Sequence, residues 1–445
     1  MRSRVARNAF YAVWVTGAGQ AVGIALQRLV VFPALFRLMG AALFGSFVLA
    51  YSIVSVLSYA PIASLNLAYY RQQQRLHGTE SASLAGAAFL LGITVASGLG
   101  LAFVLLTPFW GWLFTNPGVG AFLPGMAVVL SAMGIMWTLD SQLMLRGDFA
   151  QRAFLQAVFG VLAIVAVGLA WIDAVWGVSA GLVMASLAVS GLAFRRLWRT
   201  RAIVVERRSV FETWNTLLPG AGVYLVNTLG QMSVQYADRL VLGMYASGQV
   251  VSSYFAASTV AVLCCMPFSL VSSVLIPLMS SGRISIADRA VALRYFGAIG
   301  FGALVTVLLG VVVGPGVLSV LYGSEVAQVN QVVFPILLAG QAVYLLQQFA
   351  RPLLPLYFPL ALQILIDVLS ASGLIGLLLW AAPAAGVIGV AVAAAAGAAV
   401  FGVAYAGASV ALAGRADAAA RTRALVSGRM TTHGRTSGLR SGESV

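Results

Sequence analysis

Residues 84–106 read LAGAAFLLGITVASGLGLAFVLL, a stretch that contains no charged side chain. A helix of this length rises about 35 Å, which is enough to cross the hydrocarbon core of a bilayer. The rest of the chain repeats the pattern, since apolar stretches alternate with short polar or Pro- and Gly-bearing segments. Hydrophobic residues make up 61% of the chain and charged residues 9%, and the mean hydropathy is +0.96. This composition predicts an all-α polytopic membrane protein.

Apolar stretches of this kind predict about twelve transmembrane helices. We expect them near residues 9–32, 43–68, 84–106, 119–139, 153–172, 175–194, 216–236, 249–276, 293–313, 327–349, 356–380 and 385–412. The grouping indicates two six-helix bundles, at 1–194 and 213–413, joined by a basic linker at 195–212. The last segment, 414–445, is rich in Gly, Ser, Thr, Ala and Arg, so we expect a disordered basic tail.

The distribution of arginine predicts the topology. Each of the 26 basic residues is Arg, and most lie just outside the predicted spans. The N-terminus, the even-numbered loops, the linker and the tail carry all of them except Arg28, Arg37 and Arg239. The positive-inside rule therefore predicts a multi-pass bacterial inner-membrane protein with both termini in the cytoplasm. Because the charge follows the span ends, the net charge of +14 does not indicate a nucleic-acid partner.

The two predicted bundles repeat one another at a nearly constant offset. Three residue pairs separated by 206 or 207 positions show this repeat: Phe47 and Tyr254, Pro61 and Pro267, and Pro108 and Pro315. With six spans in each half, equivalent helices start on the same side, so we expect parallel repeats about an axis along the membrane normal. Such duplication is typical of transporters. The alternative is chance similarity in a sequence rich in Leu, Ala and Gly.

Three motifs resemble one known family. They are LFRLMGAALFGSF after the first helix, YADRLVLGMYASGQVVSSYFAAS across helices seven and eight, and VLSVLYGSEVAQVNQVVFPIL before helix ten. In this order they are similar to the oligosaccharide flippases of bacterial surface-polysaccharide pathways. These flippases belong to the multidrug/oligosaccharidyl-lipid/polysaccharide (MOP) exporter superfamily. The stretch FPLALQILIDVLSASG in helix eleven departs from the Asn-rich or Asn-Pro stretch that the family often has there.

The resemblance implies a function and a set of partners. The expected substrate is an oligosaccharide attached to polyprenyl pyrophosphate, moved by alternating access for O-antigen, capsule or exopolysaccharide synthesis. Expected partners are membrane lipids and the polymerase and chain-length proteins of the same pathway. A sugar and a pyrophosphate must cross about 30 Å of hydrocarbon, so the site between the halves should be polar and cationic.

Arg28 is the most informative polar residue of the predicted spans. An Arg inside a span costs about 2.5–3.5 kcal/mol by insertion scales and is usually kept for a partner or a pathway. Its guanidinium group can meet two phosphate oxygens at once, so Arg28 is our candidate for binding the pyrophosphate. Gln27 and Gln20 precede it on the same helix and are further candidates for binding the substrate. Alternatively, Arg28 lies near the helix end and reaches the lipid headgroups.

Other polar residues lie in the second half. Asn227, Gln231 and Gln235 are spaced by four and share one helical face, which suits sugar hydroxyls or, alternatively, bonding between neighbouring helices. For the Asp238–Arg239 pair, an internal ion pair or an interfacial position is favoured over a substrate role. Asp367 is an acid inside helix eleven, where it could carry a coupling proton or pair with an Arg.

Competing functions are less well supported by the sequence. A cation-extruding drug exporter of the same superfamily should have a carboxylate in the substrate-facing spans of its first half, yet the first helix has Arg28 and no acid. A polysaccharide polymerase or ligase should have a large outer loop with catalytic residues, and a major-facilitator sugar porter a Gly-, Asp- and Arg-rich loop after helix two. No catalytic motif, metal-ligand pattern or P-loop occurs, so we expect neither an enzyme nor a cofactor.

Overall fold

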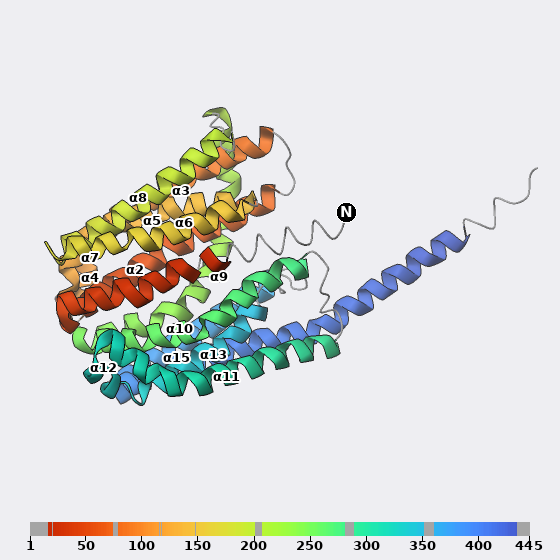
Figure 1. Ribbon diagram of the computed structural model, residues 1–445. Helices are drawn as coiled ribbons and strands as arrows, with labels where there is room; N and C mark the ends of the chain where they lie inside the picture. The colour runs from red at the N-terminus through yellow and green to blue at the C-terminus, as the bar shows by residue number, and fades with distance from the viewer. Residues whose placement is uncertain are drawn as a thin grey trace, which may run out of the picture.

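A computed structural model of the chain describes residues 17–19, 21–73, 79–114, 116, 118–146, 148–200, 207–280, 289–350 and 360–433. All regular structure in these residues is helical. Figure 1 shows the elements, which are η1 (Gln27–Val31), α2 (Phe32–Gln73), α3 (Thr79–Leu105), α4 (Thr107–Leu113), α5 (Val119–Leu145), α6 (Phe149–Leu162), α7 (Ile164–Ala170), α8 (Trp176–Arg199), α9 (Arg207–Tyr245), α10 (Gly248–Ser280), α11 (Arg289–Tyr322), α12 (Ser324–Val329), α13 (Val333–Ala350) and α15 (Leu360–His433).

The helices of the described residues are consistent with twelve spans. Nine helical segments are long and apolar enough to cross a membrane. Two of the nine are kinked pairs, because Gly40 in α2 and Gly386 in α15 have positive φ angles of 75° and 57° that only glycine adopts readily. The polar helix α9 is long enough to be a further span, which brings the total to twelve. The predicted fold class, a polytopic all-α protein of two pseudo-symmetric six-helix bundles, is confirmed.

The first span ends later in the sequence than expected and has a local irregularity. The helix does not end near Phe32 but continues through Pro33 to the bend at Gly40. Pro33 has no N–H and its ring would clash with the carbonyl of the residue four positions earlier. The preceding turn widens into the π-helix η1, in which the N–H of Phe32 donates to the carbonyl of Gln27. Such π-turns are often found at functional sites.

Helices also extend beyond two of the expected boundaries. α8 continues to Arg199 and α9 begins at Arg207, so helix occupies most of the stretch expected to be the linker at 195–212. The last helix continues to His433, although disorder was expected from Gly414 onward. Its Ala- and Arg-rich composition has a high helix propensity, which accounts for the extension.

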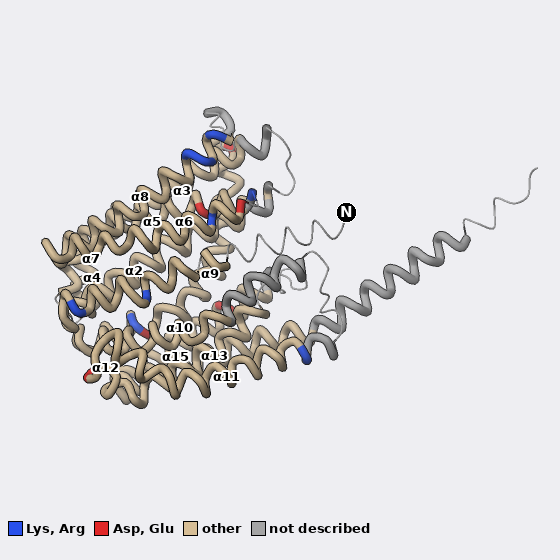
Figure 2. Tube along the Cα trace, viewed as in Figure 1, with Lys and Arg blue, Asp and Glu red and all other residues tan. Residues whose placement is uncertain are grey.

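The two halves lie side by side, and their helices form two outer layers with further helices between them (Figure 1). α3, α5, α6 and α8 form one outer layer, and α11, α13 and α15 form the other, with α2, α9 and α10 between them. We call the end of the bundle with α4 and α12 the α4 end. The opposite end, where α8 finishes and α9 begins, we call the basic end. Most charged residues lie near the ends of the helices, and few lie in the middle (Figure 2).

Close backbone contact joins the halves at the α4 end. A Cβ on Gly45 would lie 1.9 Å from the carbonyl oxygen of Gly248, so only glycine permits this approach of α2 and α10. Aromatic side chains fill the adjacent space, with Phe44 meeting Phe255 at 5.8 Å between ring centroids. Phe36 meets Tyr322 of α11 at 5.4 Å. These contacts bring the first two spans of one half against the second half.

The helix α9 contacts both halves along its length. Near its start, the indole Nε1 of Trp214 donates to the carbonyl of Ala87 in α3 at 3.1 Å. In its middle, Thr228 lies 3.3 Å from Ser64 of α2 through their hydroxyl oxygens. On the other side, Asn227 bonds with Asp367 of α15. A polar helix shared by both halves is therefore where a site between the halves can form.

Candidate functional site

Arg28 lies in the π-helical turn η1, on the side of the first span that meets the second half. Its side chain is partly buried, and its Nη1 atom is buried without a hydrogen-bond partner in the described part of the chain. The groups within its electrostatic range are Arg239, Tyr236, Tyr322 and Tyr51. Phe32, one turn further along, packs edge-to-face on Phe255 of α10 at 5.2 Å. Arg28 therefore lies close to residues of the second half.

Arg239 of α9 is the second cation of this site. It is 6% exposed, and its Nη2 donates to the hydroxyl of Ser258 in α10 at 2.8 Å. The guanidinium carbon lies 5.0 Å from the ring centroid of Phe255 and 5.6 Å from that of Tyr236, which are cation–π distances. Its Nε is buried without a partner among the described residues.

Asp238 does not form the expected ion pair with its neighbour Arg239. One carboxylate oxygen accepts from the phenol of Tyr254 at 2.7 Å, and the other accepts from the backbone N–H of Arg239 at 2.8 Å. Adjacent residues of a helix point about 100° apart, which separates the two side chains. Within the described residues, the ion pairs are Arg152 with Asp140 and Arg196 with Asp148, so neither Arg28 nor Arg239 takes part in one.

We call Arg28 and Arg239, with Ser258 and Phe255, the arginine cluster. It combines one guanidinium group from each half of the protein, and each keeps a buried N–H group without a partner in the described ranges. Two like charges in a partly dry environment repel each other, and a buried unpaired N–H group costs about 1–3 kcal/mol. A bound anion with several oxygens would relieve both penalties. The arrangement is therefore suited to bind a phosphate-like group.

A second polar cluster lies twelve residues earlier on α9. Asp367 of α15 is fully buried and accepts hydrogen bonds from the amide of Asn227 and the phenol of Tyr405. A Cβ on Gly230 would lie 2.9 Å from that of Asp367, so α9 and α15 approach closely here. We call Asp367, Asn227 and Tyr405 the aspartate cluster. Asp367 thus has neutral partners from two further spans.

The other predicted site residues lie on α9 or on the first span. Gln235 donates to the phenol of Tyr344 in α13 at 3.1 Å, so it bonds inside the second half. Gln231 lies half-buried between Asn227 and Gln235. Gln27 is partly buried in η1 beside Arg28, and Gln20 lies outside the described residues. The structure brings Arg28 together with Arg239 and not with the Asn227–Gln235 stripe.

Three aspartates of the first half have structural partners. Asp140 pairs with Arg152 at 2.9 Å and also accepts from Gln156, which joins α5 to α6. Asp148 pairs with Arg196 at 3.0 Å. Asp173 accepts from two backbone N–H groups at the start of α8. Each of these carboxylates therefore stabilises a helix end or a helix contact.

Several solved transporter structures have folds similar to that of this chain. No protein-family model matches the sequence, and no curated protein sequence matches it either. The Vibrio cholerae MATE transporter VcmN, in a mutant form, superposes with a TM-score of 0.67 and 15% identity, over 93% of this chain and 98% of its own. The lipid II flippase MurJ, in an inward closed conformation, gives a TM-score of 0.68 and 13% identity, over 90% and 86% of the two chains. The chain has the fold of the MOP superfamily.

A third structure with this fold differs in the chemistry of its pocket. A MOP-superfamily transporter from Pyrococcus furiosus, described by a reversed polarity of its binding pocket, superposes with a TM-score of 0.63 and 12% identity. The superposition covers 90% of this chain and 95% of that one. The same fold therefore carries sites of different polarity, and the residues of each site must be considered individually.

Proposed function

We propose that the protein is a flippase that moves a polyprenyl-pyrophosphate-linked oligosaccharide across the bacterial inner membrane for surface polysaccharide synthesis. The observation that carries the proposal is the arginine cluster, in which Arg28 of the first half lies within electrostatic range of Arg239 of the second half and each keeps a buried N–H group without a partner among the described residues. A pyrophosphate carries several oxygens, and each of them can accept a hydrogen bond from a guanidinium group. The flippase MurJ, which shares the fold, acts on a lipid-linked substrate.

A pyrophosphate bound between two halves also suggests how transport is driven. Because Arg28 belongs to the first half and Arg239 to the second, the anion stabilises the arrangement in which both reach it. When the halves separate on that side, the anion loses one of its two cations and is held less tightly. Alternating access of this kind requires the site to be completed by both halves. Gln27 and Gln231 are the described amides from which we expect contacts to the sugar.

The aspartate cluster is our candidate for energy coupling. Asp367 is enclosed by α9 and α15, and its partners Asn227 and Tyr405 come from two different spans. Uptake of a proton by the carboxylate would remove its need for two donors and loosen the contact between these spans. We expect Asp367→Asn to impair transport while leaving membrane insertion intact. Transport by this variant at the parent rate across pH would remove Asp367 from the mechanism.

A multidrug exporter is the second candidate, because MATE transporters share the fold. A cationic drug needs a carboxylate facing the transport path. The aspartates described in the first half bond instead to Arg152, to Arg196 and to the start of α8. The arginine cluster would repel a cation. The charges of the arginine cluster and of the first-half aspartates therefore favour an anionic substrate. A polymerase or ligase, the third candidate, has no support from the transporters that share the fold.

The topology is part of the proposal. The basic end of the bundle carries Arg146, Arg195, Arg196 and Arg199, which favours its position in the cytoplasm under the positive-inside rule. Cysteine labelling in intact cells should then find both termini in the cytoplasm. A periplasmic C-terminus would contradict the assignment.

The test of the function is accumulation of lipid-linked oligosaccharide in the inner leaflet of cells that depend on this protein. Arg28→Gln should cause accumulation at matched membrane levels, and Arg28→Lys should restore part of the transport because it keeps the charge but not the planar fork. Arg37→Gln is the matched control, since Arg37 lies on the same span but is exposed and donates to the carbonyl of Val320. If Arg28→Gln transports as well as the control, the cluster is not the substrate site. Export of cationic dyes by the parent would instead support the drug exporter.

A further inference from the structure

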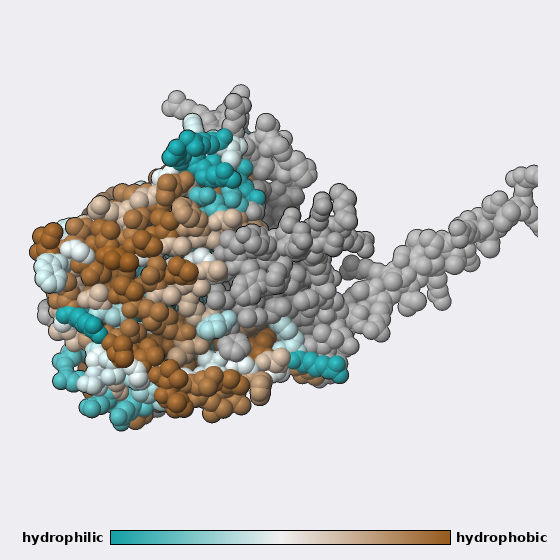
Figure 3. Space-filling view, in the orientation of Figure 1, coloured by the Kyte–Doolittle hydropathy of each residue, from teal (hydrophilic) through white to brown (hydrophobic). Residues whose placement is uncertain are grey.

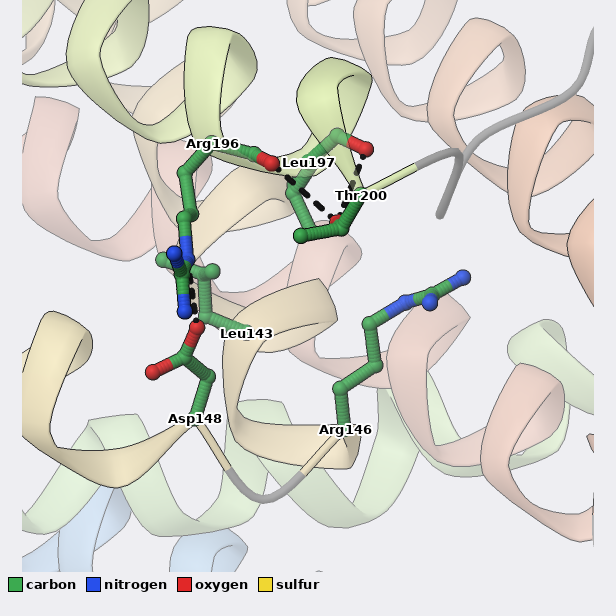
Figure 4. A pocket seen from close by; sticks show the side chains of 6 residues that line it. All are labelled: Leu143, Arg146, Asp148, Arg196, Leu197 and Thr200. Atoms are coloured by element: carbon green, nitrogen blue, oxygen red, sulfur yellow. Dashed lines mark hydrogen bonds and ion pairs between the residues drawn. The ribbon is translucent and has the colours of Figure 1, made fainter.

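A separate pocket lies at the basic end of the first half, away from the arginine cluster (Figure 4). Its volume is about 310 Å³, and it lies between the end of α5, the turn before α6 and the end of α8. The residues lining it are Leu143, Arg146, Asp148, Arg196, Leu197 and Thr200. Figure 4 shows Arg196 joined to Asp148 on one side and Arg146 extended on the other. We call it the α5–α8 pocket.

The charges of the α5–α8 pocket favour an anion. Asp148 contacts the Nε of Arg196 at 3.0 Å, which leaves the two terminal amino groups of that guanidinium for another acceptor. Arg146 adds a second cation, and desolvation lowers its pKa because the side chain lies partly against the bundle. An anion between the two arginines would be attracted by both guanidinium groups. Of the remaining lining residues, Leu143 and Leu197 are buried and apolar, and Thr200 is polar and exposed.

The position of the pocket along α8 corresponds to the headgroup level of a bilayer. Trp176 and Trp198, at opposite ends of this helix, are 56% and 59% exposed and about 33 Å apart along its axis. Exposed tryptophans at that separation mark the two membrane interfaces. Between them α8 exposes apolar side chains such as Met184 and Leu187. Figure 3 shows the brown apolar flank ending at a teal hydrophilic cap at this end of the molecule.

Aromatic packing holds Trp198, the exposed tryptophan next to the pocket, in place. Trp198 packs on Phe194 at 5.6 Å between ring centroids, and Phe194 stacks on Phe89 of α3 at 5.7 Å. Trp198 follows Leu197 directly and lies two residues before Thr200, both of which line the pocket. An occupant of the pocket is therefore in the same layer as the phosphates of the surrounding lipids.

We propose that the α5–α8 pocket binds the phosphate headgroup of an anionic phospholipid from the leaflet at the basic end. The phosphodiester would lie between Arg146 and Arg196, and the acyl chains would follow the exposed apolar flank of α8. Basic pockets between transmembrane helices are known to hold such headgroups. The bound lipid would link the ends of α5 and α8 and so fix the first half as one unit. The proposal does not depend on which substrate the protein transports.

The experiment measures binding of phosphatidylglycerol to the purified full chain in a neutral detergent, followed by the shift of the thermal unfolding midpoint. Phosphatidylcholine and inorganic phosphate serve as the other probes. Arg146→Gln and Arg196→Gln should each weaken phosphatidylglycerol binding by about tenfold or more, because each removes a charge-assisted bond. Arg195→Gln is the matched control, since Arg195 is exposed on the same helix and does not line the pocket. It should bind as the parent does.

Asp148→Asn tests the same proposal, but here phosphatidylglycerol binding should not weaken. It frees Arg196 from its ion pair and keeps a residue suited to the start of α6, so phosphatidylglycerol should bind at least as tightly as in the parent. The lipid-dependent shift is compared within each variant, so a change in basal stability does not affect the result. Unchanged binding after loss of both Arg146 and Arg196 would overturn the proposal. Equal shifts with phosphatidylcholine would also overturn it, and equal shifts with inorganic phosphate would assign the pocket to a free anion instead.

Discussion

The arginine cluster and the aspartate cluster lie on the same helix, α9, and differ in how their charges are satisfied. Asp367 accepts hydrogen bonds on both carboxylate oxygens, from Asn227 and Tyr405. Arg28 and Arg239 each keep a buried N–H group without a partner among the described residues. Buried charges are stable when every group is bonded and costly when it is not. The comparison teaches that one cluster is complete within the protein, whereas the other is ready for a ligand.

The largest expected effect is on transport when both cations are removed. The double variant Arg28→Gln/Arg239→Gln loses two charge-assisted bonds to the pyrophosphate, each worth roughly 1.5–3 kcal/mol. Transport should fall by about 10²- to 10⁴-fold in proteoliposomes that contain lipid-linked oligosaccharide. The single control Arg37→Gln should keep the parent rate. A double variant that still transports at the parent rate would show that the cluster binds no substrate.

The next largest effect is on the stability that the aspartate cluster gives to the fold. Asp367→Leu removes the buried carboxylate that accepts hydrogen bonds from Asn227 and Tyr405, which should lower the free energy of unfolding by roughly 2–5 kcal/mol. Unfolding in SDS–detergent mixed micelles measures the change. Asp367→Asn keeps one carbonyl acceptor and should lose less. Equal stability of the parent and Asp367→Leu would mean that these hydrogen bonds contribute nothing.

A smaller change in the free energy of unfolding, this time an increase, is expected when Arg28 is replaced. Arg28→Leu removes a cation that has no counter-ion and lies near Arg239, so the ligand-free protein should gain about 1 kcal/mol of stability. The same variant should lose transport, because the stabilised protein no longer holds the anion. The measurement is the same unfolding titration, run beside Asp367→Leu. A loss of stability as large as that of Asp367→Leu would indicate that Arg28 has a structural partner after all.

The smallest effect is expected at Gln235. Its amide bonds to the phenol of Tyr344 inside the second half, and a hydrogen bond between membrane helices is worth about 0.6 kcal/mol on average. Gln235→Leu should therefore lower stability slightly and leave transport within about twofold of the parent. A loss of transport similar to that of Arg28→Gln would return Gln235 to the substrate path and weaken the distinction between the two clusters.

The sequence was informative about the fold because hydrocarbon sets a strict length for each span. Regions such as 84–106 reveal a transmembrane helix from composition alone, and glycines with positive φ end two spans where apolar runs continue. The π-helical turn before Pro33 could not be located in this way. It depends on how one helix accommodates a proline, and several local geometries do so at similar cost.

The candidate site was only partly predictable. Arg28 stands out because a lone basic residue inside a span is costly, and the structure keeps it near the other half. Arg239 was less evident, since the neighbouring Asp238 suggests an ion pair when the helix in fact separates the two side chains. The partners of Asp367 lie 140 and 38 residues away in the chain. Contacts of that separation depend on packing and have no local signal in the sequence.

The central claim is that Arg28 and Arg239 hold one pyrophosphate between the two halves. The most direct measurement is the binding of farnesyl pyrophosphate and farnesyl monophosphate to the purified protein, compared with Arg28→Gln, Arg239→Gln and Arg37→Gln. The account predicts that the parent and Arg37→Gln bind the pyrophosphate more tightly than the monophosphate. Each of the other two variants should lose about tenfold or more of that affinity. Equal affinity of all four proteins for farnesyl pyrophosphate would contradict the claim.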